Sequence, residues 1–447
     1  MTKNVCVMGL GFVGFPMAIA LANVKRKGNF KYKVFGYDNS KYKTNFLLNC
    51  INKKKLPFIS NDKILKDKYS FSCKFNKIRI LEEISDLKKM DTVIVSVGFD
   101  FINKARPFEN LLKLIKDITL TAKKGSLILF ETTLPPGTFE KILLPKIKLI
   151  LKKRKFKNFD VSFGYSYERI MPGQNYYLSI TNNYRCFSGI DKNSSKKVES
   201  FLKSFVNYKK FPLRKMNSIT ECETAKVLEN SYRATNIALI DEWVKYADEL
   251  NINLLNVINA IKLRPTHSNL MLPGLGVGGY CLPKDALFAK ESANKIIKKK
   301  LRFPFIDLTS KINQNMPYSS YHFIKKRIKH LKNKKILILG ASYKNDIGDL
   351  RNSPSLKLKE ILKRNGSKIF MHDPFLRLED INSGKIPSFK KFNIILFCVK
   401  HKNYLNLSLK IFSKKNVYFD LNNVLENKQI NFLNNNKHKL FILGRDV

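Results

Sequence analysis

Three glycines near the N-terminus constrain the fold of this chain more than any other feature of its sequence. Gly9, Gly11 and Gly14 follow a short apolar run and precede residues with helical spacing. In such a turn the first glycine permits a sharp bend, the second lets a pyrophosphate approach the backbone, and the third allows close packing of helix on strand. The pattern predicts a dinucleotide site that includes Phe12 and Val13; a glycine-rich turn without a ligand is the alternative.

An acidic residue follows the second apolar run, at the position where a dinucleotide site requires one. The next apolar run covers residues 34–37 and ends at Asp38, 24 residues after Gly14. A carboxylate at this strand end accepts hydrogen bonds from both ribose hydroxyls of the ligand. Asp38 therefore favours NAD over NADP as the cofactor.

The alternation of apolar runs with helical spacing indicates the fold class. Runs typical of strands cover residues 5–8, 34–37, 92–97, 127–130, 161–165, 336–339, 369–372, 394–399, 417–420 and 440–443. Helical spacing lies between several of them, as over residues 111–121, which is typical of βαβ units around a parallel sheet. Residues 218–250 contain neither Gly nor Pro and predict one long helix. Ser353 and Pro354 predict the start of another helix.

These patterns predict an α/β protein with two Rossmann-like doubly wound domains. A central helical region with the long helix would join them. We place the domains at residues 1–205, 206–320 and 321–447.

The charge of the chain is strongly positive. Lys and Arg number 83 against 35 Asp and Glu, for a formal net charge of +48. A nucleic-acid partner would concentrate the cations on one face or element. Here lysine runs recur along the whole chain, as at residues 53–55, 152–155 and 298–300. We interpret the charge as a compositional trend and expect no specific nucleic-acid partner.

Cysteine usage and hydropathy predict a cytoplasmic protein. The seven cysteines are scattered without close pairs, which is typical of a reducing compartment. Residues 4–24 carry no charge and resemble a signal anchor, but three glycines and a proline interrupt them. A buried strand followed by a buried helix has the same hydropathy. We expect no membrane segment and no metal site.

A cysteine after a glycine-rich loop is the most informative feature for chemistry. Four glycines, at positions 274, 276, 278 and 279, precede Cys281 in a loop able to wrap closely around a substrate. A helix predicted to start near Pro283, together with Lys284, would lower the pKa of the thiol. A small buried hydrophobic residue is the alternative, and it suits the other six cysteines.

Further motifs supply polar groups at expected ligand sites. Thr133 follows a predicted strand, where side chains face the ligand crevice of a parallel sheet. Lys226 and Asn230 are four residues apart on the long helix, so they share a face and could stabilise an oxyanion. A solvated lysine beside a surface asparagine is the alternative. Residues 340–344 and 349–354 offer two cations and a helix N-terminus to a second phosphate-bearing ligand.

Taken together and in this order, the motifs resemble the UDP-glucose/GDP-mannose dehydrogenase family over nearly the whole chain. The resemblance implies an NAD domain, a central dimerisation region and a C-terminal domain that binds the nucleotide of a nucleotide sugar. It implies a homodimer formed through the central helix. It also implies NAD-dependent four-electron oxidation of the sugar's C6 hydroxyl to a carboxylate. Cys281 would trap the aldehyde as a thiohemiacetal, which is oxidised to a thioester and hydrolysed.

The same resemblance implies the roles of other residues. Lys226 and Asn230 would steady the oxyanion, and Glu168 would act as general acid and base for hydrolysis. Thr133 and Asp285 would position water and Lys226. The remaining implied contacts are Thr133, Lys284 and Arg351 for the cofactor, and Glu168, Lys226, Asn230, Arg264, Gly278 and Lys344 for the substrate, with Arg264 reaching across the dimer.

Three segments depart from the family's pattern. Ser166-Tyr167-Glu168 stands where the family usually has Ser-Pro-Glu, which changes the local turn. Residues 97–100 replace a Val-Pro-Thr-Pro run near the nicotinamide, and Asp241-Glu242 replaces Asn-Glu. Residues 168–173 are more similar to the branch that acts on UDP-N-acetylhexosamines than to the branch that acts on UDP-glucose.

Two other functions remain open on the sequence. A two-electron hydroxyacid dehydrogenase of the 6-phosphogluconate type also has a Rossmann domain followed by long helices, but it needs neither the Cys281 loop nor the C-terminal α/β region. A basic nucleotide- or nucleic-acid-binding protein without catalysis would account for the charge. It would leave Cys281, Lys226, Asn230 and Glu168 unexplained as a set.

Overall fold

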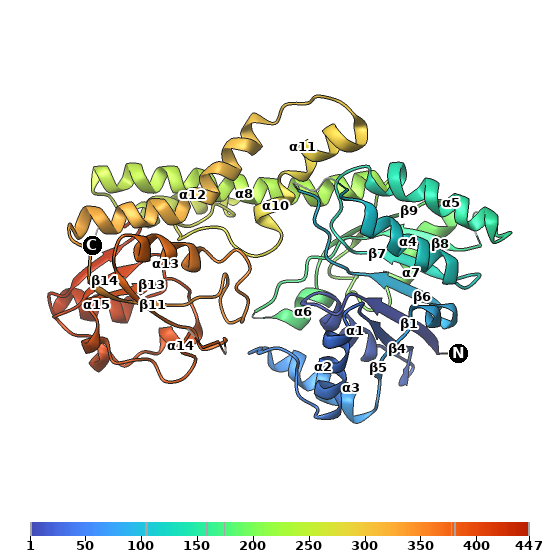
Figure 1. Ribbon diagram of the computed structural model, residues 1–447, viewed down its shortest axis with the longest axis horizontal. Coiled ribbons are helices and arrows are strands. Elements are labelled where there is room, and N and C mark those ends of the chain that lie inside the picture. The colour runs from blue at the N-terminus through green and yellow to red at the C-terminus, as the bar shows by residue number, and fades with distance from the viewer. Residues whose placement is uncertain are drawn as a thin grey trace. The chain divides into compact units, whose positions relative to one another are not determined.

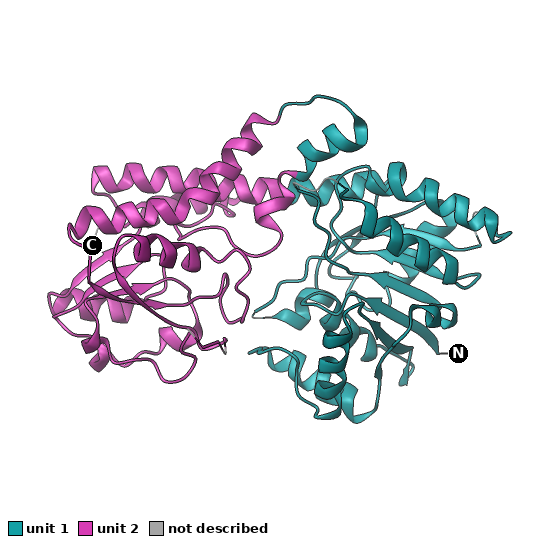
Figure 2. Ribbon diagram, viewed as in Figure 1, with its two compact units in different colours: residues 1–229, 288–302 teal, residues 230–287, 303–447 magenta. Residues whose placement is uncertain are grey.

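The computed structural model describes residues 2–102, 106–157, 160–173, 175–376, 378–379 and 381–445. Their contacts divide the chain into two units, drawn in teal and magenta in Figure 2. The N-terminal unit comprises residues 1–229 and 288–302, and the C-terminal unit comprises residues 230–287 and 303–447. The chain therefore passes from one unit to the other three times. The division into three domains with boundaries near 205 and 320 stays a prediction.

An eight-stranded sheet lies at the centre of the N-terminal unit (Figure 1). Its strand order is β10-β9-β8-β7-β6-β1-β4-β5. Neighbouring strands are parallel except β8 and β9, which pair antiparallel. The strands are β1 Lys3–Met8, β4 Tyr32–Tyr37, β5 Ile78–Ile80, β6 Thr92–Val95, β7 Leu127–Phe130, β8 Ser162–Tyr165, β9 Arg185–Gly189 and β10 Leu213–Lys215, with a separate hairpin of β2 Lys25–Arg26 and β3 Asn29–Phe30. The mostly parallel α/β architecture confirms the predicted fold class.

Helices pack against both faces of this sheet. The helices are α1 Gly14–Ala22, α2 Lys41–Asn52, α3 Lys63–Lys74, α4 Glu109–Thr121, α5 Leu144–Lys153, α6 Tyr176–Thr181, α7 Lys192–Leu202 and α11 Phe288–Ser292, with short 3₁₀ or π turns at Ile84–Lys89, Phe139–Leu143 and Ala293–Ile297. Alternate residues of β1 enter different apolar clusters, Val5 and Val7 in one and Cys6 and Met8 in the other. Because successive strand residues point to opposite faces, the unit has a core on each side of the sheet.

The apolar runs predicted five strands of this sheet but not β5, β9 and β10. Every residue of β6, β7 and β8 is buried, so these strands are nearly continuous apolar runs. The edge strands β5 and β10 carry exposed cations, as at Arg79 and Arg214. β9 also begins with a cation, Arg185, but this side chain is buried. A prediction from the spacing of apolar residues misses such short, charged strands, because they are strands through their hydrogen bonds to neighbouring strands and not through their hydropathy.

The long predicted helix is confirmed as α8, Ile219–Leu250, which is 32 residues and about 48 Å long. Its residues up to Glu229 belong to the N-terminal unit, and those from Asn230 onward belong to the C-terminal unit. One face of its C-terminal half is buried through Ile240, Val244 and Ala247.

A second, five-stranded sheet forms the C-terminal unit, in the order β12-β11-β13-β14-β15, with every neighbouring pair parallel. Its strands are β11 Lys335–Leu339, β12 Lys368–His372, β13 Ile394–Phe397, β14 Val417–Asp420 and β15 Lys439–Ile442. Its helices are α9 Leu254–Lys262, α10 Leu282–Asp285, α12 Pro304–Arg327, α13 Pro354–Arg364, α14 Lys402–Leu405 and α15 Asn427–Asn435, with 3₁₀ turns at Pro265–His267, Phe389–Lys391 and Leu409–Ile411. The Ser353 side chain caps α13, as predicted, by accepting a hydrogen bond from the Leu356 backbone N–H.

Residues 4–24 form β1 and α1, and every residue of α1 is buried against the sheet. Across the described residues, we find no helix with the length and apolar character needed to span a bilayer.

Candidate active site

The glycine turn after β1 has the conformation that a dinucleotide site needs. Gly9 has a φ of +87°, and a Cβ there would lie 2.7 Å from the Ser96 carbonyl oxygen. A Cβ at Gly14 would lie 2.0 Å from the Gly9 oxygen, so only glycine allows α1 to approach the strand this closely. Gly11 is exposed and faces open space. These features leave room for a pyrophosphate against the backbone at the start of α1.

Asp38 lies beside this turn at the end of β4. Its Oδ2 accepts a hydrogen bond from the Leu10 backbone N–H at 2.9 Å and lies 2.6 Å from Lys43 Nζ on α2. Sequence reasoning did not single out Lys43. The ion pair restrains the carboxylate at the position predicted for ribose binding.

A cavity of about 730 Å³ opens from the turn in the N-terminal unit. Gly9, Gly11 and Asp38 line it together with Val97 and Phe99, so the departing 97–100 segment forms one of its walls. Glycine backbone, an acidic strand end and an apolar wall suit a dinucleotide. The residues present therefore fit NAD, which would supply hydride-accepting chemistry when bound.

The loop after β7 carries the predicted Thr133 and is held by neighbouring groups. The Thr132 hydroxyl donates to the Val97 carbonyl oxygen at 2.8 Å. Farther along, the buried Glu223 of α8 accepts hydrogen bonds from the backbone N–H groups of Gly137 at 2.7 Å and Phe139 at 2.9 Å. Burial raises the pKa of Glu223 to about 8, although these hydrogen bonds oppose the shift. Glu223 thus attaches the first turns of α8 to the Thr133 loop.

A buried ion pair precedes the same loop. Arg185 Nη1 lies 2.6 Å from Glu131 Oε1, and both side chains are almost completely buried. Burial raises the pKa of Glu131, while the positive charge of Arg185 lowers it and the negative charge of Glu168 raises it further. Glu131 therefore experiences the field of Glu168, one of the predicted catalytic residues.

Lys226 and Glu168 meet in the N-terminal unit. Lys226 is 7% exposed, and its Nζ donates to the Glu168 backbone oxygen at 3.0 Å. The Glu168 carboxylate accepts the Ile170 backbone N–H, which closes a tight turn after β8. The structure therefore brings together two predicted residues that are 58 positions apart in the sequence.

The C-terminal unit holds Cys281 and its neighbours. Cys281 is exposed and directly precedes α10, which is only four residues long. Asp285 is fully buried and accepts hydrogen bonds from Asn230 Nδ2 and Lys284 Nζ, each at 2.8 Å. Lys284 Nζ also lies 4.4 Å from the centre of the Tyr280 ring. Asp285 thus joins the Cys281 segment to α8 within this unit.

The glycine loop before Cys281 packs against the segment that follows β11. A Cβ at Gly278 would lie 2.6 Å from Tyr343 Cβ, and one at Gly279 would lie 2.6 Å from the Tyr343 ring. The Gly279 backbone N–H donates to the Arg351 carbonyl oxygen at 2.8 Å. Glycine is needed here because the backbone itself, with a φ of +84° at Gly279, contacts the opposite segment.

Cationic side chains lie on and near the segment that follows β11. Arg351 forms a two-point ion pair with Asp349, with Nη2 2.6 Å from Oδ2 and Nε 3.0 Å from Oδ1. Burial and the nearby charge of Arg233 lower the pKa of Lys344 to about 8. Arg264, by contrast, is exposed on the segment after α9. Arg233 lies one turn beyond Asn230 on α8, and sequence reasoning missed it.

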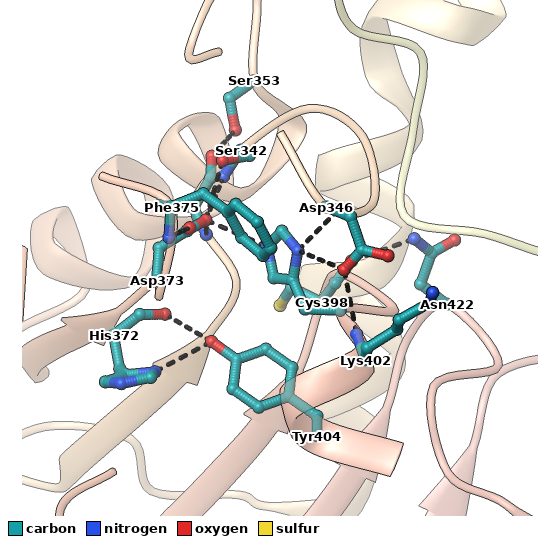
Figure 3. A network of polar contacts seen from close by, with 12 residues as sticks. Ser342, Asp346, Ser353, His372, Asp373, Phe375, Cys398, Lys402, Tyr404 and Asn422 are labelled. Carbon is teal, nitrogen blue, oxygen red and sulfur yellow. Dashed lines mark hydrogen bonds and ion pairs between the residues drawn. The ribbon is translucent and has the colours of Figure 1, made fainter. Parts of the chain in front are cut away.

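A buried polar network anchors the loop that carries Lys344 (Figure 3). Asp373 Oδ2 accepts hydrogen bonds from the Ser342 backbone N–H and hydroxyl, both at 2.8 Å, and lies 3.1 Å from His401 Nε2. The Asp346 backbone N–H donates to His401 Nδ1 at 2.8 Å. Nδ1 therefore carries a lone pair, and the proton of a neutral His401 sits on Nε2, directed at Asp373.

This network determines the ionisation of Asp373. Burial alone would raise the pKa of its carboxyl group, but the hydrogen bond from His401 and those from backbone N–H groups outweigh burial and lower the pKa. An ionised Asp373 holds both ends of the Lys344 loop, through Ser342 directly and through His401 to Asp346.

The predicted residues are thus distributed over both units. Glu168, Lys226, Thr133, Asp38 and the glycine turn belong to the N-terminal unit, and the other predicted residues belong to the C-terminal unit. Sequence reasoning missed four residues that contact the predicted residues, hold the loops that carry them or act on them electrostatically: Lys43, Glu131, Glu223 and Arg233. Each is a charged residue on or beside a predicted element, but only proximity in the fold shows which group it acts on.

Fold and site together define a Rossmann-fold dehydrogenase with a second α/β unit suited to a phosphate-bearing ligand. Comparison with known proteins agrees. The chain matches three domains of the UDP-glucose/GDP-mannose dehydrogenase family: the NAD binding domain over residues 3–206, the central domain over 220–315 and the UDP binding domain over 337–427. This chain belongs to that family, and it is an NAD-dependent nucleotide-sugar dehydrogenase.

The similarity to individual relatives extends over nearly the whole chain. A UDP-N-acetyl-D-mannosamine dehydrogenase of Methanococcus vannielii is 30% identical over 442 residues, which cover 93% of this chain and 94% of the relative. A protein of the same name from Pyrococcus horikoshii is 27% identical over 446 residues, covering 96% and 98% of the two chains. The solved structure of UDP-D-ManNAc dehydrogenase from Pyrococcus horikoshii has the same fold, with a TM-score of 0.80 at 24% identity over 99% of this chain and 100% of that one.

Proposed function

We propose that this enzyme oxidises the C6 hydroxyl of a UDP-N-acetylhexosamine to the carboxylate in two hydride transfers, through a covalent bond to Cys281. The observation that carries the proposal is the position of Cys281. All seven cysteines lie in the described part of the chain, and Cys281 alone is exposed. It follows a glycine loop that packs tightly on the segment with Tyr343 and Lys344.

The proposed chemistry needs no co-reactant other than NAD and water. The first hydride leaves C6 for NAD while the hydroxyl loses its proton, which gives the aldehyde. The Cys281 thiolate adds to the aldehyde carbon and forms a thiohemiacetal. The second hydride leaves this carbon for another NAD while the thiohemiacetal hydroxyl loses its proton, which gives a thioester. Water then displaces the sulfur, releasing the carboxylate and restoring the thiol, so the reactive aldehyde never leaves the enzyme.

The polar residues take distinct roles in this proposal. Lys226 and Asn230 stabilise the negative oxygen that develops in each addition step. Glu168 exchanges protons with the hydrolytic water, which Thr133 helps to position. Asp285 positions Asn230 and Lys284 through the two hydrogen bonds of its carboxylate. Lys284 and Arg351 contact the cofactor, and Gly278, Lys344 and Arg264 contact the substrate.

The choice of sugar rests on the relatives. The two relatives described above are named for UDP-N-acetyl-D-mannosamine, and residues 337–427 match a UDP binding domain. We therefore propose UDP-N-acetyl-D-mannosamine as the first substrate to test, with UDP-glucose as the alternative.

We further propose that the enzyme is a cytoplasmic homodimer that pairs through α8. Leu239, Trp243, Tyr246 and Leu250 recur at intervals of three or four residues on α8, and each is 45–56% exposed. An apolar stripe of this kind on a single chain is typical of a helix that pairs with a second copy. The exposed position of Arg264 is compatible with a reach across that interface.

The test is the number of NADH molecules formed per sugar consumed, over a panel of UDP- and GDP-sugars. We expect two NADH per UDP-N-acetylhexosamine, with a uronic acid as product. One NADH per sugar would instead support the two-electron alternative, and none from any sugar would overturn the proposal. Cys281→Ser should bind NAD normally but lose turnover, whereas the control Cys73→Ser should retain it. Normal turnover in Cys281→Ser would overturn the covalent mechanism.

A further inference from the structure

Tyr167 occupies the middle of the Ser166-Tyr167-Glu168 turn, where the resemblance leads one to expect proline. Its side chain is 1% exposed, so the turn places an aromatic ring inside the N-terminal unit. Proline would restrict this turn through its own ring. Tyrosine has no such backbone restriction, and any restraint it provides must come from the contacts of its side chain.

The ring of Tyr167 contacts a proposed catalytic group. Lys226 Nζ lies 5.3 Å from the ring centre, within the range of a cation–π interaction. The same nitrogen donates to the Glu168 backbone oxygen at 3.0 Å. Lysine has a flexible four-carbon stem, so contacts with its ammonium restrain where the charge lies. The ring of Tyr167 and the carbonyl of Glu168 supply these contacts from adjacent residues of one turn.

The hydroxyl of Tyr167 fixes the ring to α8. It donates to Glu229 Oε2 at 3.2 Å and accepts a hydrogen bond from Arg169 Nη2 at 2.8 Å. Arg169 also binds Glu229 directly, with Nη2 2.9 Å from Oε2 and Nε 3.1 Å from each carboxylate oxygen. Arg169 and Glu229 thus hold the Tyr167 turn on α8, three residues beyond Lys226.

We propose that Tyr167 is a positioning residue, whose ring holds the Lys226 ammonium where the oxyanion of the proposed reaction develops. The inference rests on the proposed role of Lys226. Only the aromatic face acts on the ammonium, and the hydroxyl serves to orient that face. The Arg169–Glu229 ion pair remains without the hydroxyl, so the turn stays attached to α8 when the hydroxyl alone is removed.

The experiment compares Tyr167→Phe, which keeps the ring, with Tyr167→Leu, which removes it. We expect kcat for nucleotide-sugar oxidation within about twofold of wild type in Tyr167→Phe. In Tyr167→Leu we expect kcat to fall by about 3- to 30-fold, the factor that one cation–π contact supplies. KM for the sugar nucleotide and for NAD should change by less than twofold in both variants, because neither substitution removes a proposed binding group. If Tyr167→Leu does not fold, Tyr167→Met replaces it.

A second pair of measurements separates this inference from the function on which it rests. In a Lys226→Ala background, Tyr167→Leu should cause no further loss of the residual rate, because the ammonium that the ring positions is already absent. Equal kcat values for Tyr167→Phe and Tyr167→Leu, or a further loss in the Lys226→Ala background, would overturn the positioning role. Normal kcat in Lys226→Ala alone would instead overturn the proposed role of Lys226.

Discussion

Lys344 illustrates how neighbouring groups change the chemistry of one residue. Burial and Arg233 lower its pKa to about 8, so it loses its charge within a pH range that is accessible to assays. In the unfolded chain its pKa is near 10.5. Between these values the unfolded chain binds more protons than the folded chain, and this group makes the protein more stable as the pH rises. Binding of an anion to Lys344 has the opposite dependence on pH: it weakens as the pH rises, because it needs the charged form of this lysine.

We therefore predict that KM for the nucleotide sugar rises above pH 8. Loss of the Lys344 charge should raise KM by up to about 25-fold between pH 7.5 and 9.5, because the charged fraction of a group with a pKa of about 8 falls by that factor over this range. The measurement is a series of KM determinations over this range at saturating NAD. Lys344→Arg keeps its charge and should remove the rise; the same rise in this variant would show that another group causes it.

At the scale of elements, the structure depends on contacts that join a loop to the strands around it. The loop after β11 carries Tyr343 and Lys344. Asp373 at the end of β12 holds this loop through Ser342 and, by way of His401, through Asp346. If the Asp373 carboxylate is removed, these buried donors lose their acceptor but stay out of contact with water, and this lowers the free energy of unfolding.

Asp373→Asn should destabilise the C-terminal unit and weaken substrate binding. An amide cannot accept all the hydrogen bonds that the carboxylate accepts, and we expect a loss of about 1–3 kcal/mol in the free energy of unfolding. The urea midpoint should fall, and KM for the nucleotide sugar should rise more than KM for NAD. Glu360→Gln, which removes an exposed carboxylate from α13, is the control. An unchanged midpoint in Asp373→Asn would contradict the anchoring role.

At the scale of the whole molecule, α8 connects the proposed chemistry to the proposed assembly. One helix carries Glu223, Lys226 and Asn230 toward its start and the exposed stripe of Leu239, Trp243, Tyr246 and Leu250 toward its end. An interface on this stripe would bury apolar side chains that the single chain leaves exposed.

Trp243→Glu should therefore convert a dimer into a monomer. A charge in the middle of the stripe would have to be buried without a partner, which opposes association. Light scattering after size exclusion should give twice the chain mass of 51.8 kDa for the wild type and about one chain mass for the variant. Leu149→Glu, at an exposed apolar position on α5, should remain dimeric. A wild-type mass of one chain would contradict the proposed dimer.

The sequence by itself determined those features whose cause is local. The glycine turn, the central strands and α8 all follow from glycine conformation or from the period of apolar residues over a short stretch. Cys281 could be selected as the candidate nucleophile because the glycines that shape its loop are adjacent in sequence. Lys226 and Asn230 could be paired because helical spacing alone places them on one face.

Only the tertiary structure decided which charged side chains act on these groups. The contacts of Glu223 with the loop at Gly137 and of Asp373 with Ser342 join residues 86 and 31 positions apart. The position of Tyr167 against Lys226 depends on how the turn after β8 packs on α8. Lysine is so abundant in this chain that composition cannot distinguish Lys43 or Lys344 from the solvated majority. Burial and distance distinguish them, because the energy of a charge depends on its surroundings and these are formed by residues remote in sequence.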